Sequence, residues 1–337
     1  CTEIEGDVYI FGPEIYNLNG LSILCSIGGD LEILGNDSLH NLSGLENLTH
    51  IRGNLHFDML LLNNLAGLNG LTFIGGGLHF NRISGLQNLN GLENLNTIGD
   101  YLGFGSYGTA SSGGTSISSL NGLEGLDSIY GGLAFTYNGN LTDIEALDGL
   151  DYLGGGLAIQ FNSSLAACES DWLCEYLQSP NGTVNIRDNA VGCNSIIEVG
   201  EMCGPPVPCL PYGNYQFLTQ TDINNFQNVF PGCTELEGYV SISDFGLFKS
   251  SISKLGSKIS NLDGLNAITS IGGPLYIGFT DSLVSLDGLS LLSSINGELY
   301  INSNNLLTSL TGLDNIDAET ITYLRISQNA SLSQCEV

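Results

Sequence analysis

The sequence predicts a mainly β protein: a right-handed β-helix-like solenoid with coils of about 24 residues, in two tandem domains with helical and disulfide-bonded caps. Three observations predict this fold class. One apolar frame recurs along the chain, and a strand-like triplet ends each copy of it. Segments that are rich in cysteine, or that have a helical pattern, stand where the runs of repeats begin or stop.

The repeated frame is G-L-x-x-L-x-x-I-x-G-x-L-x-[IF]. It reads GLENLTHIRGNLHF at 44–57, GLNGLTFIGGGLHF at 67–80 and GLNAITSIGGPLYI at 264–277. Its isoleucine position falls at Ile27, Ile51, Ile74 and Ile98, in steps of 24, 23 and 24 residues. A constant period of this size predicts units that bury their apolar faces against one another.

Each part of the frame predicts its own local structure. In L-x-[IF], alternate residues point to one side, so the triplet is expected to be a short strand with two inward side chains. Gly, Asn, Ser and Thr interrupt the preceding L-x-x-L-x-x-I, which favours a tight arc over an amphipathic helix. The glycine after the isoleucine indicates either a positive φ or a close approach of two backbones.

A column of asparagines follows the strands. We expect these side chains to point inward at a bend and to bond backbone groups that no strand ladder satisfies. The column comprises Asn36, Asn138, Asn162, Asn189, Asn304 and Asn329, with Thr280 substituting once.

Composition changes predict the domain boundaries. The repeats stop before a cysteine-rich segment, and four prolines in GPPVPCLPYG indicate a stiff linker. The expected domains are 1–204, with the C-terminal cap at 168–203, and 214–337, joined by a linker at 205–213.

Two short helices are expected near this boundary. DWLCEYL predicts a helix that begins at Ser170 or Asp171. The segment 220–230, capped by Thr221 or Asp222, places Ile223, Phe226 and Phe230 on one helical face.

Phrases repeated at the two ends indicate that the chain is a window of a longer tandem array. CTEIEG at the start returns as CTELEG at 233–238, which makes the array unit 233 − 1 = 232 residues. NSSLAACES at 162–170 similarly resembles NASLSQCEV at 329–337. The first domain is then expected to lack its N-terminal cap, and the second its C-terminal cap.

Charge narrows the choice of partners. Seven basic and 35 acidic residues give a formal net charge of −28, which argues against nucleic acid and anionic membranes. No run of about 18 apolar residues is present, so no membrane insertion is expected. No cofactor is expected, although acidic turns near Asp148 and Asp287 leave Ca²⁺ binding open.

The frame, together with Cys209, the helix 220–230 and CTELEGYVSI from Cys233, resembles the receptor L domain. That family comprises leucine-rich, β-helical ligand-binding modules of insulin-receptor-like and epidermal-growth-factor-receptor-like ectodomains. The version here, which is acidic and rich in glycine and asparagine, looks more like tandem leucine-rich-repeat modules of large secreted bacterial surface proteins. The resemblance covers nearly the whole chain at the level of repeats and implies an extracellular, cell-surface location.

Nine cysteines also favour an oxidising, extracellular setting. In receptor L domains the two entry cysteines pair, so the resemblance implies a Cys209–Cys233 disulfide. Two further disulfides are then expected within the cap, among Cys168, Cys174, Cys193 and Cys203.

Three cysteines are left over. Cys335 matches Cys168, and Cys1 matches Cys233, so we expect their mates to lie outside the chain. Cys25 has no counterpart and is interpreted as a buried thiol, with pairing to Cys1 on the adjacent coil as the alternative.

The outward residues of the strands form the expected contact face, and the small residues Gly103, Ala134 and Ala158 are expected to make a flat patch within it. His56 and His79 would be neighbours at a spacing that could hold a metal, but a surface role is favoured. The outward positions contain no carboxylate pair and no Ser-His-Asp set, so we expect no enzymatic activity. The face comprises Tyr9, Glu32, His56, His79, Tyr276 and Tyr300.

The favoured function is a structural and adhesive segment of a very long extracellular surface protein or appendage, mediating surface attachment or cell–cell contact. Its expected partners are other copies of the unit in the same chain or in lateral oligomers, and a cell-surface protein or glycan. The alternative is a receptor ectodomain that binds a peptide or glycan on the strand face. An enzyme of the β-helix lyase type is a distant third.

Overall fold

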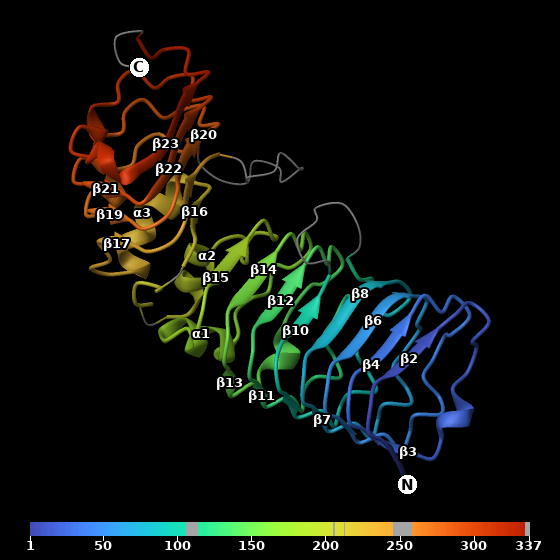
Figure 1. Cartoon of the computed structure of the whole chain (residues 1–337). Helices are drawn as coiled ribbons and strands as arrows, with labels where there is room; N and C mark the ends of the chain where they lie inside the picture. The colour runs from blue at the N-terminus through green and yellow to red at the C-terminus, as the bar shows by residue number, and fades with distance from the viewer. Residues whose placement is uncertain (106–113, 205, 212, 245–257, 334–337) are drawn as a thin grey trace. The chain divides into compact units, whose positions relative to one another are not determined.

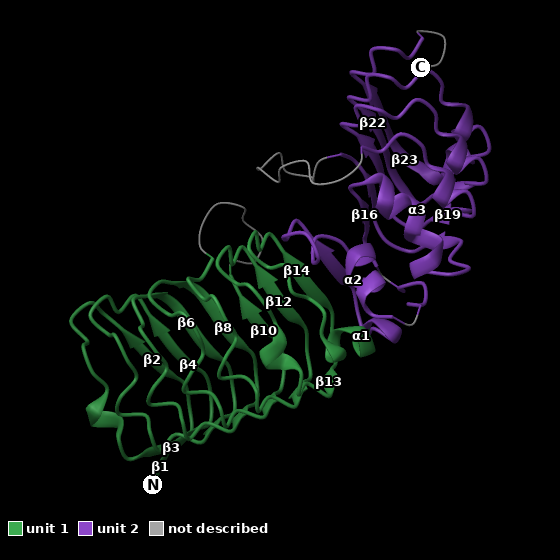
Figure 2. Cartoon of the chain, turned by 180° about the vertical axis from the view of Figure 1, so that it is seen from behind, with its two compact units in different colours: residues 1–176 green, residues 177–337 purple. Residues whose placement is uncertain are grey.

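The computed structural model describes residues 1–105, 114–204, 206–211, 213–244 and 258–333 (Figure 1). The chain divides into two compact units, Cys1–Tyr176 and Leu177–Val337 (Figure 2). The expected linker therefore lies inside the second unit, where Val207 and Leu210 are buried. The domain limits expected at 204 and 214 stay a prediction.

Strands of the first unit alternate between two parallel sheets, and each sheet pairs the strands of successive repeats. Sheet 1 follows the order β1 (Thr2–Ile4), β3 (Leu24–Ile27), β5 (His50–Ile51), β7 (Phe73–Ile74), β9 (Thr97–Ile98), β11 (Ser128–Ile129) and β13 (Tyr152–Leu153). Within this unit, sheet 2 follows the order β2 (Val8–Phe11), β4 (Leu31–Leu34), β6 (Leu55–Leu60), β8 (Leu78–Ile83), β10 (Leu102–Phe104), β12 (Leu133–Thr136) and β14 (Leu157–Gln160).

The second unit repeats this alternation after β15 (Val184–Arg187). Sheet 3 runs β16 (Tyr215–Phe217), β18 (Val240–Ile242), β20 (Leu275–Gly278), β22 (Gly297–Asn302) and β23 (Ile321–Ser327). Sheet 4 runs β17 (Glu235–Leu236), β19 (Ser270–Ile271) and β21 (Ser294–Ile295).

Both helices expected from the sequence are present, as α1 (Asp171–Gln178) and α3 (Gln220–Val229). The cap of α3 is neither Thr221 nor Asp222: the Thr219 side chain accepts from the Asp222 backbone N–H in a capping box. A third helix, α2 (Ile196–Met202), was not expected, although Ser195 and Glu198 carry the Ser-x-x-Glu pattern of a helix start. Short 3-10 turns occur at Asn19–Leu21, Glu145–Leu147, Asp263–Leu265, Asp287–Leu289, Thr311–Leu313 and Ala318–Thr320.

The predicted fold class, a leucine-rich-repeat, right-handed β-helix-like solenoid, is wrong. The 23 strands in the described residues form four parallel sheets, accompanied by three α-helices in an α/β-like arrangement, and no sheet of this part closes or forms a solenoid. The reason lies between the two strands of each repeat. Those residues form turns and bends, so the two sets of strands stay separate sheets instead of joining into a continuous wall.

The apolar positions of the frame form the core. Leu31 pairs with Leu55 and Ile33 with Phe57 in parallel register, and all four side chains are buried. Next to them a row of phenylalanine rings fills the first unit with centroid separations of 5.2, 5.0 and 5.2 Å. The row comprises Phe57, Phe80, Phe104 and Phe135. Regular register therefore places like residues on like residues.

Two glycine positions of the frame answer different needs. A Cβ on Gly76, the frame glycine two residues after Ile74, would lie 2.8 Å from the carbonyl carbon of Gly53 in the preceding repeat, so close approach is the reason there. Gly67, which opens the frame, has a φ of +112°. Close approach therefore explains the glycine after the isoleucine, and positive φ occurs instead at the glycine that opens the frame.

Candidate functional site

The outward residues of sheet 2 stand in one register column. Tyr9 pairs with Glu32, Glu32 with His56, and His56 with His79. Tyr9 is 58% exposed, and the other three side chains are half-buried. Because one residue of each repeat joins the column, neighbouring side chains lie about 5 Å apart, the spacing of paired strands.

The two histidines form the centre of this column. Their ring centroids lie 5.9 Å apart in an edge-on arrangement, and the ring of His79 stacks on Tyr101 at 5.3 Å. Burial lowers the pKa of His79, and the neighbouring His56 lowers that pKa further, while Asp100 opposes both effects. In the part of the chain that the structure describes, no group of three or more His, Cys, Asp or Glu residues could hold a metal ion.

The flat patch expected at Gly103, Ala134 and Ala158 is mostly hidden from solvent. Gly103 and Ala134 are buried, and only Ala158 is partly exposed. The Tyr101 ring lies against Gly103, where an added Cβ would be 2.2 Å from the ring Cε1 atom. Sequence reasoning missed Tyr101 because it precedes the strand triplet, and its place one residue before Leu102 was the available signal.

A second outward column crosses sheet 3. Tyr276 pairs with Tyr300, and Tyr300 with Arg325. The centroid distances are 6.4 Å between Tyr276 and Tyr300, and 5.7 Å between Tyr300 and Tyr323. The hydroxyl of Tyr300 donates to Glu298 at 2.8 Å, and this bond is the first cause of its raised pKa. Three exposed or half-buried rings therefore lie side by side across β20, β22 and β23.

The asparagine column lies inside the molecule. Asn36, Asn138, Asn162, Asn189 and Asn304 are at most 1% exposed, and Asn329 is half-buried. A residue with positive φ precedes each of them, at Gly35, Tyr137, Phe161, Asp188, Ser303 and Gln328. This left-handed residue bends the chain after each strand and turns the amide inward.

The bonds of the column run between repeats. The Nδ2 of Asn162 donates to the carbonyl of Phe135 at 3.0 Å, and its Oδ1 accepts from the Asn138 backbone N–H at 2.9 Å. In the second unit, Asn304 Oδ1 likewise accepts from Thr280, whose hydroxyl donates at 2.6 Å. Each amide thus replaces ladder bonds at the bend.

Eight cysteines are disulfide-bonded, which makes four disulfides. One joins Cys209 and Cys233, with a Cα–Cα distance of 5.4 Å. Cys168, Cys174, Cys193 and Cys203 are also disulfide-bonded. Four disulfides indicate an oxidising, extracellular environment.

Cys1 pairs with Cys25, again at a Cα–Cα distance of 5.4 Å. The interpretation of Cys25 as a buried thiol, and the expectation of an external mate for Cys1, are therefore wrong. The parallel pairing of β1 with β3 places the two residues side by side, as the alternative required. Cys335 lies outside the described residues.

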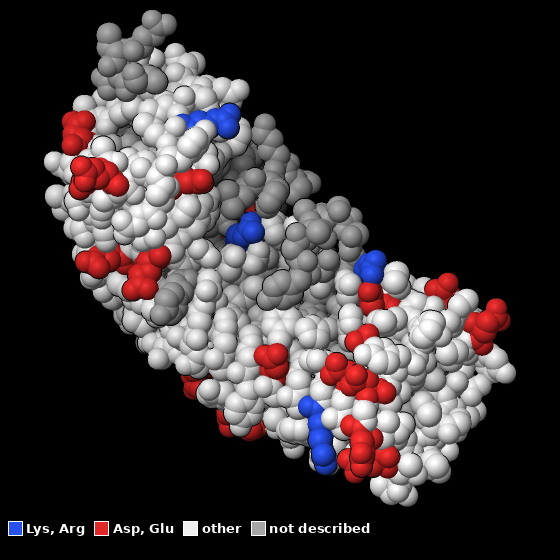
Figure 3. Space-filling view, in the orientation of Figure 1, with Lys and Arg blue, Asp and Glu red and all other residues white. Residues whose placement is uncertain are grey.

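Acidic side chains outnumber basic ones on the face shown in Figure 3. At the turns considered for calcium, Asp148 accepts a hydrogen bond from Ser170 at 2.6 Å, and Asp287 is exposed. Calcium binding there stays a prediction. In the described ranges no helix is both long and apolar enough to cross a bilayer.

Comparison with known families finds no family model that matches the chain, and comparison with curated proteins finds no match either. The residues themselves therefore carry the functional argument.

Proposed function

We propose that the chain is a structural and adhesive segment of a long extracellular surface protein, and that it attaches through the exposed strand faces. The row of Tyr276, Tyr300 and Tyr323 on sheet 3 carries the proposal. Aromatic side chains are enriched in protein contact surfaces, and tyrosine offers an apolar ring together with a polar hydroxyl. Four disulfides and the resemblance of the repeats to receptor L domains support the extracellular, cell-surface setting.

The column of Tyr9, Glu32, His56 and His79 on sheet 2 would act in the same way in the first unit. Neither column combines a nucleophile with a base and a residue that orients it, so the proposal includes no catalysis. Repetition matters here because many weak contacts in one chain add up to avid attachment.

The test measures attachment of beads coated with the chain to cell surfaces. We expect the double variant Tyr276→Ser and Tyr300→Ser to reduce attachment at least tenfold, since central aromatic residues commonly dominate contact energies. The matched control is Tyr152→Ser, which removes a tyrosine that is 45% exposed on sheet 1. Equal attachment by both variants would refute the role of this face.

A receptor ectodomain is the second candidate, because the same aromatic row could bind a single soluble peptide or glycan. The length of the parent polypeptide separates the two functions. Many copies of the 232-residue unit favour an adhesin or appendage, and two copies followed by a membrane span favour a receptor.

A further inference from the structure

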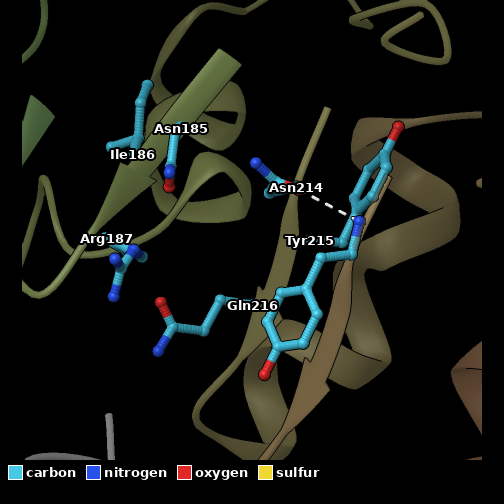
Figure 4. Close-up of a pocket in the computed structure, with 7 residues that line it drawn as sticks. Asn185, Ile186, Arg187, Asn214, Tyr215 and Gln216 are labelled. Carbon is cyan, nitrogen blue, oxygen red and sulfur yellow. Dashed lines mark hydrogen bonds between the residues drawn. The ribbon is translucent and has the colours of Figure 1, made fainter. Parts of the chain in front are cut away.

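A cavity of about 150 Å³ lies in the second unit between β15 and β16 (Figure 4). One parallel bridge joins Val184, the first residue of β15, to Gly213, two residues before β16. The cavity is lined by Asn185, Ile186, Arg187, Asn214, Tyr215, Gln216 and Tyr239.

Gln216 is the unusual member of this lining. Its side chain is 4% exposed, and neither its amide nitrogen nor its amide oxygen has a hydrogen-bond partner. A carboxamide can donate two hydrogen bonds and accept two, and a buried one that makes none destabilises the fold relative to an apolar residue of the same shape. Figure 4 shows the amide end of Gln216 directed toward Arg187. An unpaired buried amide at a cavity indicates a ligand that supplies its partners.

The remaining polar groups suit an uncharged ligand. Arg187 Nη1 donates to Asp188 at 2.9 Å, so its charge is balanced within the protein. Asn214 Oδ1 accepts from the Tyr239 backbone N–H at 3.0 Å, which holds that amide in place. Among the described residues that line the cavity, none carries a carboxylate. The polar lining therefore consists chiefly of carboxamides, beside a guanidinium that already has its counter-charge.

We propose that this cavity binds one residue of a neutral sugar. Sugar hydroxyls both donate and accept hydrogen bonds, as the amides of Gln216, Asn185 and Asn214 do. The half-buried ring of Tyr239 offers apolar surface to the carbon face of a sugar ring. A cavity of about 150 Å³ accommodates a six-membered ring. The balanced local charge and the net charge of −28 disfavour a carboxylate ligand.

Sugar binding would supply one ligand class for attachment, so its biological role rests on the proposed function. Sugar binding itself needs no cell. Titration of the full chain with glucose, galactose, mannose and N-acetylglucosamine, followed by calorimetry or NMR, tests it. We expect a dissociation constant of about 1 mM for at least one of them, and binding at least tenfold weaker for glucuronate.

The variant Gln216→Met keeps the length of the side chain and removes the unpaired amide. It should weaken sugar binding at least tenfold, while the unfolding midpoint of the free chain stays the same or rises. The matched control, Gln178→Met, alters an exposed glutamine and should change neither quantity. Should Gln216→Met fail to fold, Asn185→Ala provides the second variant, because Asn185 is half-buried at the cavity wall.

Any of three results would overturn the site. No neutral sugar binds at a concentration about fifty times the expected dissociation constant, glucuronate binds more tightly than every neutral sugar, or Gln216→Met binds sugar as tightly as the parent chain does. The two proposals fail separately. Sugar binding without bead attachment refutes the adhesive face, and attachment without sugar binding refutes the pocket.

Discussion

Replacing Asn138 by leucine tests the physical role of the asparagine column. The Asn138 Oδ1 accepts from the Thr115 N–H at 3.1 Å and from the Thr115 hydroxyl at 2.8 Å. Its Nδ2 donates to the carbonyls of Phe104 and Thr136 at 3.1 and 3.2 Å. The substitution leaves two donors and two acceptors around a side chain that is 1% exposed.

The magnitude follows from these contacts. Each buried group that loses its partner costs about 1–3 kcal/mol, although the Thr115 hydroxyl can rotate to a new acceptor. Burial of the leucine returns about 1–2 kcal/mol, which leaves a net loss of about 3 kcal/mol. Leucine fits sterically, because Leu60 and Ile83 occupy the equivalent place as the last residues of β6 and β8 and are buried there.

Urea unfolding of the chain measures this loss. With a slope of about 2 kcal/mol per molar, the midpoint of the first unit should fall by about 1.5 M. Hydrogen exchange at the Thr115 amide should also accelerate, which locates the effect. The control Asn140→Ala changes an exposed residue and should stay within about 0.5 kcal/mol. If Asn138→Leu costs less than about 0.5 kcal/mol, the amides do not hold the bends together.

Three further outcomes are expected. Gly99→Ala should destabilise the first unit by at least about 2 kcal/mol in urea, because its Cβ would meet a backbone carbonyl, whereas Gly20→Ala, which meets no atom within 4 Å, should be nearly neutral. By NMR titration, His79 should have a pKa below 6.5, and His56→Gln should raise it. The native state then binds fewer protons than the unfolded state, so His79 destabilises the fold as the pH falls below 6.5; a pKa of His79 above 6.5 would contradict this. Burial raises the pKa of Asp222 to about 6, so the native state keeps this proton to a higher pH than the unfolded state does. The free energy of unfolding should therefore decrease as the pH rises from about 4 to about 6, by about 3 kcal/mol at most. Unchanged pH dependence in Asp222→Asn would contradict this.

The local parts of the fold could be predicted from the sequence, because short-range rules determine them. Alternation in L-x-[IF] identified the inward residues, and spacing on one face identified the helix around Phe226. The arrangement of the sheets could not be predicted in this way. Whether the two strands of one repeat belong to one continuous sheet or to two separate sheets depends on how strands pair between repeats, and no local sequence pattern encodes that pairing.

The candidate site likewise contains residues that could be predicted from the sequence and one that could not. The order Tyr9, Glu32, His56 and His79 follows from the period alone, and the pairing of the strands agrees with it. Gln216 was missed because its burial depends on residues far away in the sequence. The alternation of Tyr215 and Phe217 around it was the available signal, since it repeats the strand triplet before Cys233.

The break in the asparagine column at its first member has a physical cause in the sequence. In four other members of the column, the Oδ1 accepts from the backbone N–H at the same position of the preceding repeat; these members are Asn138, Asn162, Asn304 and Asn329. Phe11 pairs with Leu34, so continuing the register by two residues places Pro13 opposite Asn36. Proline has no backbone N–H, and the Asn36 Oδ1 is buried without a partner. Its Nδ2 still donates to the Ile10 carbonyl at 2.9 Å, so the amide keeps half of its role. The column therefore depends on backbone donors supplied by the neighbouring repeat, and one residue without a donor is enough to interrupt it.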